Sequence, residues 1–178
     1  LVDEIGGRSV KPYQPAGLLR HLNFPSRTYK QDTGDDQYRR GIYTHWQRQF
    51  LHPAMKSFDA PAREECTAER TRSNTPLAAL VLLNDPSYVE AARVFAERLM
   101  ATGDATDQNR ITRVIRQALS REPNEQEISI LSSLIDQQRE HYKANPDSAK
   151  ELVSVGLTPV ADQVDPVELA SLMAATRA

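Results

Sequence analysis

The sequence predicts a mostly α-helical protein, in which an irregular N-terminal layer rich in aromatic residues and arginine packs on a helical bundle. Three observations support this. Leucine, alanine and valine recur at helical spacing in residues 76–178. Residues 1–75 hold 8 of the 11 aromatic residues and 5 of the 7 glycines. The net charge of −2 divides into +3 over residues 1–75 and −5 over residues 76–178.

The 178 residues suit one domain, with residues 1–75 as the layer and residues 76–178 as its helical part. The chain begins at Leu1 without an initiator methionine or a signal peptide pattern. We therefore expect it to be a piece of a larger domain in a longer protein.

The first predicted helix starts at Thr75, which can cap it, and Pro76, which suits the first helical position. Residues 77–83 are entirely apolar, so we expect this helix to be buried on all sides. Asp85 and Pro86 start the next helix, which ends near Thr102. Its apolar residues at helical spacing are Tyr88, Ala92, Phe95, Ala96 and Leu99.

Four further helices follow in the acidic part. The first carries Ile111, Val114, Ile115 and Ala118 on one face. The longest opens at Asn124, with Glu127 three residues on as in a capping box, and ends before Pro146. A short helix runs from about Asp147 to Val155 and stops at Gly156. The last starts at Asp165-Pro166, reaches the end of the sequence, and is expected to lack the partner it packs on.

The first 75 residues give weaker helical signals. A short helix is predicted at Pro15–Leu22. Tyr38, Ile42, Trp46 and their apolar neighbours favour a helix from Asp36 to Phe50, although the alternation of Ile42, Thr44 and Trp46 also fits a strand.

Composition excludes several functions for this part of the protein. The near-neutral charge argues against nucleic-acid binding, and no apolar run is long enough to span a membrane. The single cysteine, Cys66, cannot form an internal disulfide or a zinc site. No Cys-x-x-Cys-His motif is present, so the sequence predicts no cofactor in this chain. The four histidines lack metal-ligand spacing, and no metal site is predicted.

Three short sequence features have structural alternatives. Asp32-Thr33-Gly34 matches the catalytic triplet of aspartic proteases, but it occurs once and follows no apolar strand, which favours a chance turn. Asp32, Asp35 and Asp36 could bind calcium, or they could form an acidic turn that caps a helix. Cys66, with arginines nearby, could be a nucleophile or a small core residue.

Residues 58–77 form the densest polar stretch. Its arginines could bind a carboxylate, phosphate or sulfate, or they could pair internally with Asp59, Glu64 and Asp85. Aromatic and basic residues also interleave earlier in the layer, where flat side chains could stack on a sugar or cover the core. The candidate ligand-binding residues are Lys11, Tyr13, Arg39, Arg40, Asp59, Arg63, Arg70 and Arg72.

Several separate motifs together carry a family resemblance. They are Gly6–Pro15, Phe24–Gly34, Tyr38–Thr44, Phe58–Pro61 with Arg63-Glu64, and Arg72–Pro86. The chain resembles the C-terminal domain of unknown function of large planctomycete cytochrome-c-associated proteins. The resemblance implies an exported, extracytoplasmic, multidomain protein whose other parts can carry haem c. It supplies no catalytic residues.

The sequence thus favours a non-catalytic structural or interaction module, whose partners are other domains of its own longer chain or another protein. The alternative is a binding or hydrolytic site for an anionic or carbohydrate ligand, built on residues 6–76. Electron transfer is a third hypothesis and requires haem from another domain. Whether the protein is an enzyme is left open.

Overall fold

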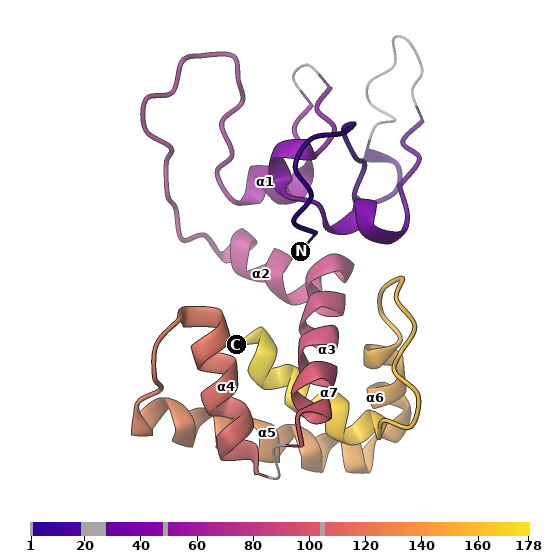
Figure 1. Ribbon diagram of the computed structural model, residues 1–178, viewed down its shortest axis with the longest axis vertical. Coiled ribbons are helices and arrows are strands. Elements are labelled where there is room, and N and C mark those ends of the chain that lie inside the picture. Colours follow the sequence, from indigo (N-terminus) through magenta and orange to yellow (C-terminus); the bar gives the residue numbers. More distant parts are fainter. Residues whose placement is uncertain (1, 19–27, 48–49, 104–105) are drawn as a thin grey trace. The chain divides into compact units, whose positions relative to one another are not determined.

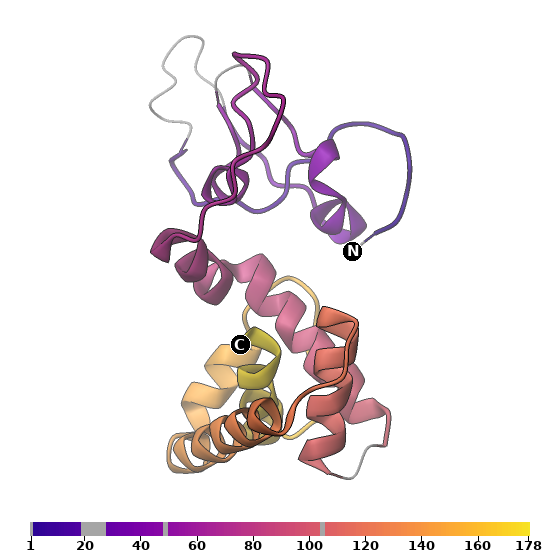
Figure 2. The ribbon, with the colours of Figure 1, turned by 90° about the vertical axis from the view of Figure 1, so that its left-hand side faces the viewer.

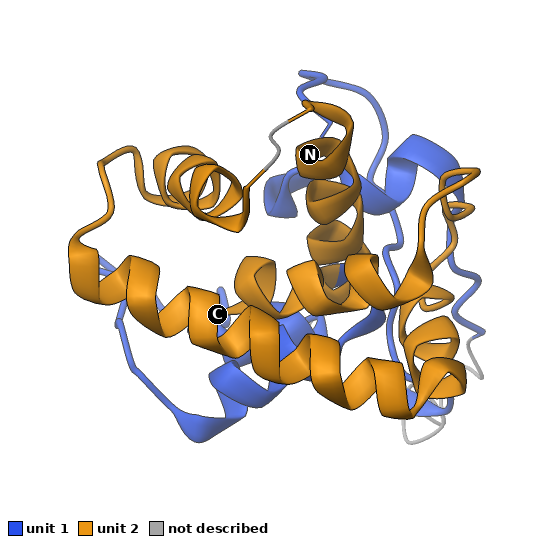
Figure 3. Ribbon diagram, turned by 90° about the horizontal axis from the view of Figure 1, so that it is seen from below, with its two compact units in different colours: residues 1–87 blue, residues 88–178 orange. Residues whose placement is uncertain are grey.

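The computed structural model describes residues 2–18, 28–47, 50–103 and 106–178. They form two compact units, residues 1–87 and residues 88–178 (Figure 3). The prediction of a mostly α-helical protein is confirmed, because the described residues contain seven α-helices and, in place of a sheet, three isolated β-bridges. That the chain forms one domain stays a prediction.

The helices of the second unit are α3 (Pro86–Ala101), α4 (Asp107–Leu119), α5 (Glu125–Ala144), α6 (Pro146–Val153) and α7 (Pro166–Arg177). Helices α3, α5 and α7 begin at the residues that the sequence indicated, α6 begins one residue before its predicted start, and no start was predicted for α4. Asn124 accepts from the Glu127 backbone N–H while the Glu127 carboxylate accepts from the Asn124 N–H, which completes the predicted capping box. The Asp165 side chain caps α7 by accepting from the Val167 N–H.

The apolar core of the second unit centres on α7. This helix packs against α5 and α6, beside which it lies in Figures 2 and 3. Its residues 169–173 and 175 are buried, and Leu169 and Met173 are completely enclosed. The expectation that this helix lacks its packing partner is therefore wrong. Its sequence is apolar on most sides because other helices surround it.

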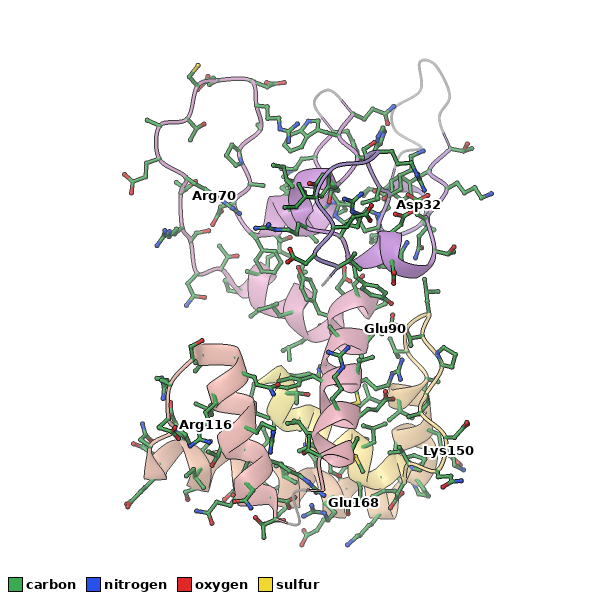
Figure 4. The ribbon with its side chains drawn as sticks, in the orientation of Figure 1. Asp32, Arg70, Glu90, Arg116, Lys150 and Glu168 are labelled. Carbon is green, nitrogen blue, oxygen red and sulfur yellow. The ribbon has the colours of Figure 1, made fainter. Side chains whose placement is uncertain are left out.

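Helix α3 also holds the loop that joins α6 to α7. Glu90, only 3% exposed, accepts hydrogen bonds from the backbone N–H groups of Leu157 (3.0 Å) and Thr158 (2.7 Å). Arg93 is fully buried and donates to the Thr158 carbonyl at 2.6 Å and to the Glu97 carboxylate. Two charged side chains on consecutive turns of α3 therefore fix the irregular loop by hydrogen bonds (Glu90 is labelled in Figure 4).

The first unit has little regular structure, as predicted. It contains the 3-10 helices η2 (Gly34–Tyr38) and η3 (Gly41–Tyr43), and the α-helices α1 (Pro53–Ser57) and α2 (Pro76–Asn84). The single helix predicted over Asp36–Phe50 is wrong. Half of the helix predicted at Pro15–Leu22, residues 19–22, lies outside the described part of the chain.

Long-range backbone pairing explains why the longer helix does not form. The Val10 N–H donates to the Tyr43 carbonyl, and the His45 N–H donates to the Val10 carbonyl. The Val2 N–H donates likewise to the Tyr38 carbonyl. These bonds to the N-terminal segment occupy groups that a continuous helix would need for its own i to i−4 bonds. Helical spacing of apolar residues did not reveal this non-local pairing.

The interior of the first unit is polar. Its buried residues, among those described, are Val10, Gln37, Arg39 and His52. The Gln37 side chain accepts from the Tyr13 N–H at 3.0 Å and from the Gln31 amide, and it donates to the carbonyls of Lys11 and Asp32. Hydrogen bonds therefore hold this unit where apolar contacts hold the other.

Helix α2 is exposed, although eight of its nine residues, Pro76 to Leu83, are non-polar. Thr75 caps it as predicted, by accepting from the Ala78 N–H. No residue of α2 is buried, and Leu77, Leu80, Leu82 and Leu83 are among the most exposed large apolar side chains described. The prediction that this helix is buried on all sides is wrong.

Candidate functional site

Three of the predicted binding residues belong to the polar interior of the first unit. Lys11 and Tyr13 take part through their backbones: the Lys11 N–H donates to the Asp32 carboxylate at 2.7 Å, and the Tyr13 carbonyl bonds His52 Nε2 at 2.8 Å. Arg39 is buried, donates to the carbonyls of Glu4 and Gly6, and lies 4.0 Å from the centre of the Tyr43 ring. These residues support the fold of the layer.

His52 is part of this support. Burial lowers its pKa below the usual value, an effect only partly offset by its hydrogen bond to the Tyr13 carbonyl. The ring is therefore neutral at pH 7. Because a carbonyl oxygen only accepts, the proton of the neutral ring lies on Nε2. His52 thus acts as a fixed donor.

The acidic turn at residues 32–36 is also held internally. The Asp32 carboxylate accepts from the Lys11 N–H, and Arg8 pairs with Asp36 at 2.6 Å and with Asp32 at 3.4 Å. The pKa of Asp32 is lowered, first by the hydrogen bond from Lys11 and then by the charge of Arg8. Among the described residues, no group of three or more histidine, cysteine, aspartate or glutamate side chains could hold a metal ion.

A second group of predicted residues gathers at a closed loop, residues 59–73. One oxygen of the Asp59 carboxylate accepts from the Ser73 N–H at 2.7 Å and from its hydroxyl at 2.6 Å. Arg70 donates to the carbonyls of Phe58 and Asp59. The ends of the loop are thereby joined, as in Ω-loops. Figure 1 shows the segment as a wide arc between α1 and α2, and Figure 4 labels Arg70.

Asp59 closes the loop as an ionised group. The hydrogen bonds from Ser73 are the main reason that its pKa lies below the usual value, and the charge of Arg70 adds to them. Its backbone is left-handed, with φ 55°, as is that of Arg63, with φ 63°. Two non-glycine residues with left-handed backbone conformation within five positions indicate that hydrogen bonds determine the shape of the loop.

The closed loop borders a pocket of about 360 Å³, within the range of small-molecule sites. Its lining residues are Phe58, Asp59, Glu69, Arg70, Thr71, Arg72 and Ser73. Of the eight predicted residues, Asp59, Arg70 and Arg72 therefore share one cavity. Arg72 and Glu69 make no hydrogen bond or ion pair with other described residues.

The remaining predicted residues lie elsewhere. Arg63 belongs to the closed loop, and its guanidinium lies 4.0 Å from the centre of the Trp46 ring. Arg40 is exposed and directly precedes η3. Among the described residues, the predicted internal ion pairs between the arginines of residues 58–77 and Asp59, Glu64 and Asp85 are replaced by other contacts. In the described part of the chain, neither Glu64 nor Asp85 forms an ion pair with these arginines, and Asp85 instead accepts from the Ser87 N–H.

Sequence reasoning missed Glu69 and Phe58 as pocket residues and missed α2 as a surface. The polar stretch contained both pocket residues, but only the loop closure by Asp59 and Ser73 brings them to one cavity. The position of α2 directly after a polar stretch was a signal that this helix could be exposed. Cys66, in the same loop, is an exposed free thiol and not a core residue.

No helix in the described part of the chain combines the length and apolar character needed to cross a membrane. The chain matches no curated protein and no solved structure. The model of a family described as "Protein of unknown function (DUF1553)", PSD1, matches residues 1–135, which include the whole first unit and more than half of the chain. With its polar first unit, its closed loop and the helices that follow, the chain belongs to this family of uncharacterised domains.

Proposed function

We propose that this chain is a non-catalytic docking module and that α2 is its docking surface. The observation that carries the proposal is the exposure of an almost entirely apolar helix. Leu77 and Leu80 are 58% and 55% exposed, and no residue of α2 is buried. Contiguous apolar surface of this kind is typical of interaction sites.

The size of α2 indicates which partner it fits. Half the surface of a nine-residue helix is roughly 230 Å², from its rise and diameter. A stable interface between separate proteins buries ~800 Å² on each partner. Covering roughly 230 Å² of apolar surface contributes about 6 kcal/mol, which is close to the cost of associating two free molecules. A partner tethered in the same polypeptide avoids most of that cost. The proposed occupant is therefore another segment of a longer chain.

The context of this longer chain is part of the proposal. The motifs of residues 6–86 resemble those of planctomycete cytochrome-c-associated proteins, and the family match supports an uncharacterised domain. We place the module in an exported, extracytoplasmic, multidomain protein. Haem c would be attached to another of its domains, since this sequence has no Cys-x-x-Cys-His motif.

Hydrogen exchange tests the docking surface. Amide exchange of residues 76–84 is measured in this chain alone and in the longer native polypeptide. In the chain alone we expect weak protection, because an exposed nine-residue helix opens easily. In the longer polypeptide we expect protection to rise at least ~100-fold. Residues 146–153 of α6 serve as the internal control, since this helix packs on α7 in either case.

A pair of matched substitutions shows whether the side chains of α2 matter. Leu80→Glu is compared with Ile130→Glu on α5, since these residues are 55% and 57% exposed. Only Leu80→Glu should abolish the added protection of α2 in the longer polypeptide. Equal protection of α2 in both forms of the wild-type protein, or equal effects of the two substitutions, would contradict the proposal.

A second candidate function is ligand binding at the pocket of the closed loop. The specific observation is that Asp59, Arg70 and Arg72, all predicted for an anionic or carbohydrate ligand, line the same cavity. The lowered pKa of Asp59 is the reverse of what a general acid needs, so this geometry supports binding more than hydrolysis. Saturable binding that depends on Arg72 would test it.

A further inference from the structure

We infer that the pocket of the closed loop binds a neutral polyol, of the carbohydrate class, and not an anion. This inference rests on the second proposed function, that the pocket binds a ligand. It is independent of docking through α2.

The charges around the pocket cancel. Asp59 and Glu69 supply two carboxylates, and Arg70 and Arg72 supply two guanidinium groups. A pocket that selects phosphate, sulfate or a carboxylate gathers positive charge and excludes negative charge. Here any anion that approached Arg72 would also approach the carboxylate of Glu69. Selective anion binding is therefore disfavoured.

Two charged groups of the pocket are wholly available to a ligand, one of them a donor and the other an acceptor. Arg70 already donates to two backbone carbonyls, and one oxygen of Asp59 already accepts twice from Ser73. Arg72 and Glu69 have no such partners among the described residues, although both line the cavity. The free guanidinium offers only donors, and the free carboxylate offers only acceptors.

A sugar satisfies both groups at once, because each of its hydroxyl groups can donate and accept. One hydroxyl can donate to Glu69 while its neighbour accepts from Arg72, and the Thr71 hydroxyl is a further partner. Phe58 adds an apolar surface for the C–H face of the ring. The closure of the loop by Asp59 and Ser73 orders the site before binding, which lowers the entropic cost.

Titration of the complete chain with named probes tests the inference. The neutral probes are cellobiose, maltose and lactose, and the anionic probe is sodium sulfate, all at constant ionic strength. Binding is followed by calorimetry and by the emission of Trp46. This residue is the only tryptophan and lies under Arg63 of the loop, so it reports on the site.

The expected result is saturable binding of at least one neutral disaccharide and no saturable response to sulfate. Arg72→Ala and Glu69→Ala should each weaken disaccharide binding by about tenfold or more, as expected for loss of a hydrogen bond to a charged group. Arg40→Ala, an exposed arginine of the same unit outside the pocket, should leave binding unchanged. All of these positions are exposed, and circular dichroism confirms that each variant is folded.

Glu69→Ala distinguishes the two ligand classes, because it should change their binding affinities in opposite directions. Removing this carboxylate weakens a polyol but strengthens an anion. If sulfate binds, loses affinity in Arg72→Ala and gains affinity in Glu69→Ala, ligand binding at the pocket stands and the polyol class is wrong. If neither sulfate nor any of the disaccharides binds, both the inference and the second proposed function are overturned.

Discussion

The loop between α6 and α7 offers a sharp test of how the second unit is held together. Gly156 has φ 115°, a conformation that residues with a side chain rarely adopt. A Cβ atom added to it would lie 2.6 Å from the carboxyl carbon and from one carboxylate oxygen of Glu90. Gly156→Ala therefore forces alanine into an unfavourable conformation and also displaces a buried carboxylate.

The two effects can be estimated separately. The unfavourable φ costs about 1–2 kcal/mol. Relief of the clash needs a shift of ~1 Å, since such atoms normally lie at about 3.5 Å. That shift takes the Glu90 oxygens out of hydrogen-bond range of Leu157 or Thr158, now at 3.0 Å and 2.7 Å. Loss of one bond to a charged group costs about 1.5–3 kcal/mol. The total is about 2.5–5 kcal/mol.

For a unit of ~90 residues this loss lowers the melting temperature by at least ~10 °C. Thermal unfolding followed by circular dichroism at 222 nm measures it. Gly103→Ala is the matched control, because Gly103 also has a positive φ, 74°, but no atom lies within 4 Å of an added Cβ. We expect it to lose only the backbone contribution. If the two variants unfold alike, the contact with Glu90 contributes nothing and the reasoning is refuted.

Three other features give further predictions. The pKa of Glu127 is lowered to about 2, chiefly by its hydrogen bonds from Arg121 and then from the Asn124 N–H, whereas the unfolded value is near 4.5. The contribution of Glu127 to stability is therefore complete above pH ~4.5 and is lost as the pH falls towards 2. Carboxyl NMR should give a titration midpoint near pH 2 for Glu127, and a midpoint near 4.5 would contradict its pairing with Arg121. Gln37→Leu should destabilise the first unit by about 2–4 kcal/mol in urea unfolding followed by Trp46 emission, because it removes the partners of the Tyr13 N–H and the Asp32 carbonyl. The Lys11 carbonyl keeps its hydrogen bond from the Asp32 N–H. Gln31→Leu, which removes one hydrogen bond to the Gln37 side chain, should cost less, and equal losses would exclude a central role for Gln37. Cys66 should react fully with a thiol reagent in the native protein and at the same rate in urea, since it is exposed; protection in the native state would count against the open loop.

The helices of residues 86–178 could be predicted from the sequence because their signals are local. Capping at Asn124 and Asp165 depends on neighbouring residues, and the structure confirms it. Helix α6 ends at Val153, before the predicted stop at Gly156. The segment Asp36–Phe50 could not be predicted in this way, because bonds from Val2 and Val10 decide its backbone. Its apolar spacing carried no information about these distant partners.

Burial was harder to predict than secondary structure. Two helices with mostly apolar sequences, α2 and α7, have opposite environments: α7 is the centre of a core, and α2 is exposed. Composition describes what a helix can bury but not whether other helices surround it.

The candidate site was predicted in part for a similar reason. Arginine and aspartate in residues 58–77 indicated polar chemistry, and the structure brings Asp59, Arg70 and Arg72 to one pocket. Arg39 has the same chemistry but donates to the backbone carbonyls of Glu4 and Gly6 and stacks on Tyr43. Residue type could not distinguish these two environments, because a guanidinium group can donate either to backbone carbonyls or to a ligand.

The polar interior of the first unit has a consequence for how this sequence can vary. An apolar core accepts many side chains of suitable volume, so positions such as Leu169 and Met173 can exchange with other apolar residues at small cost. A core closed by Gln37 accepts almost none, since its amide oxygen accepts two hydrogen bonds and its amide nitrogen donates two, and a replacement must satisfy all four together. Substitutions in this polar interior should therefore be tolerated only in compensating sets, while the apolar core of the second unit can diverge residue by residue.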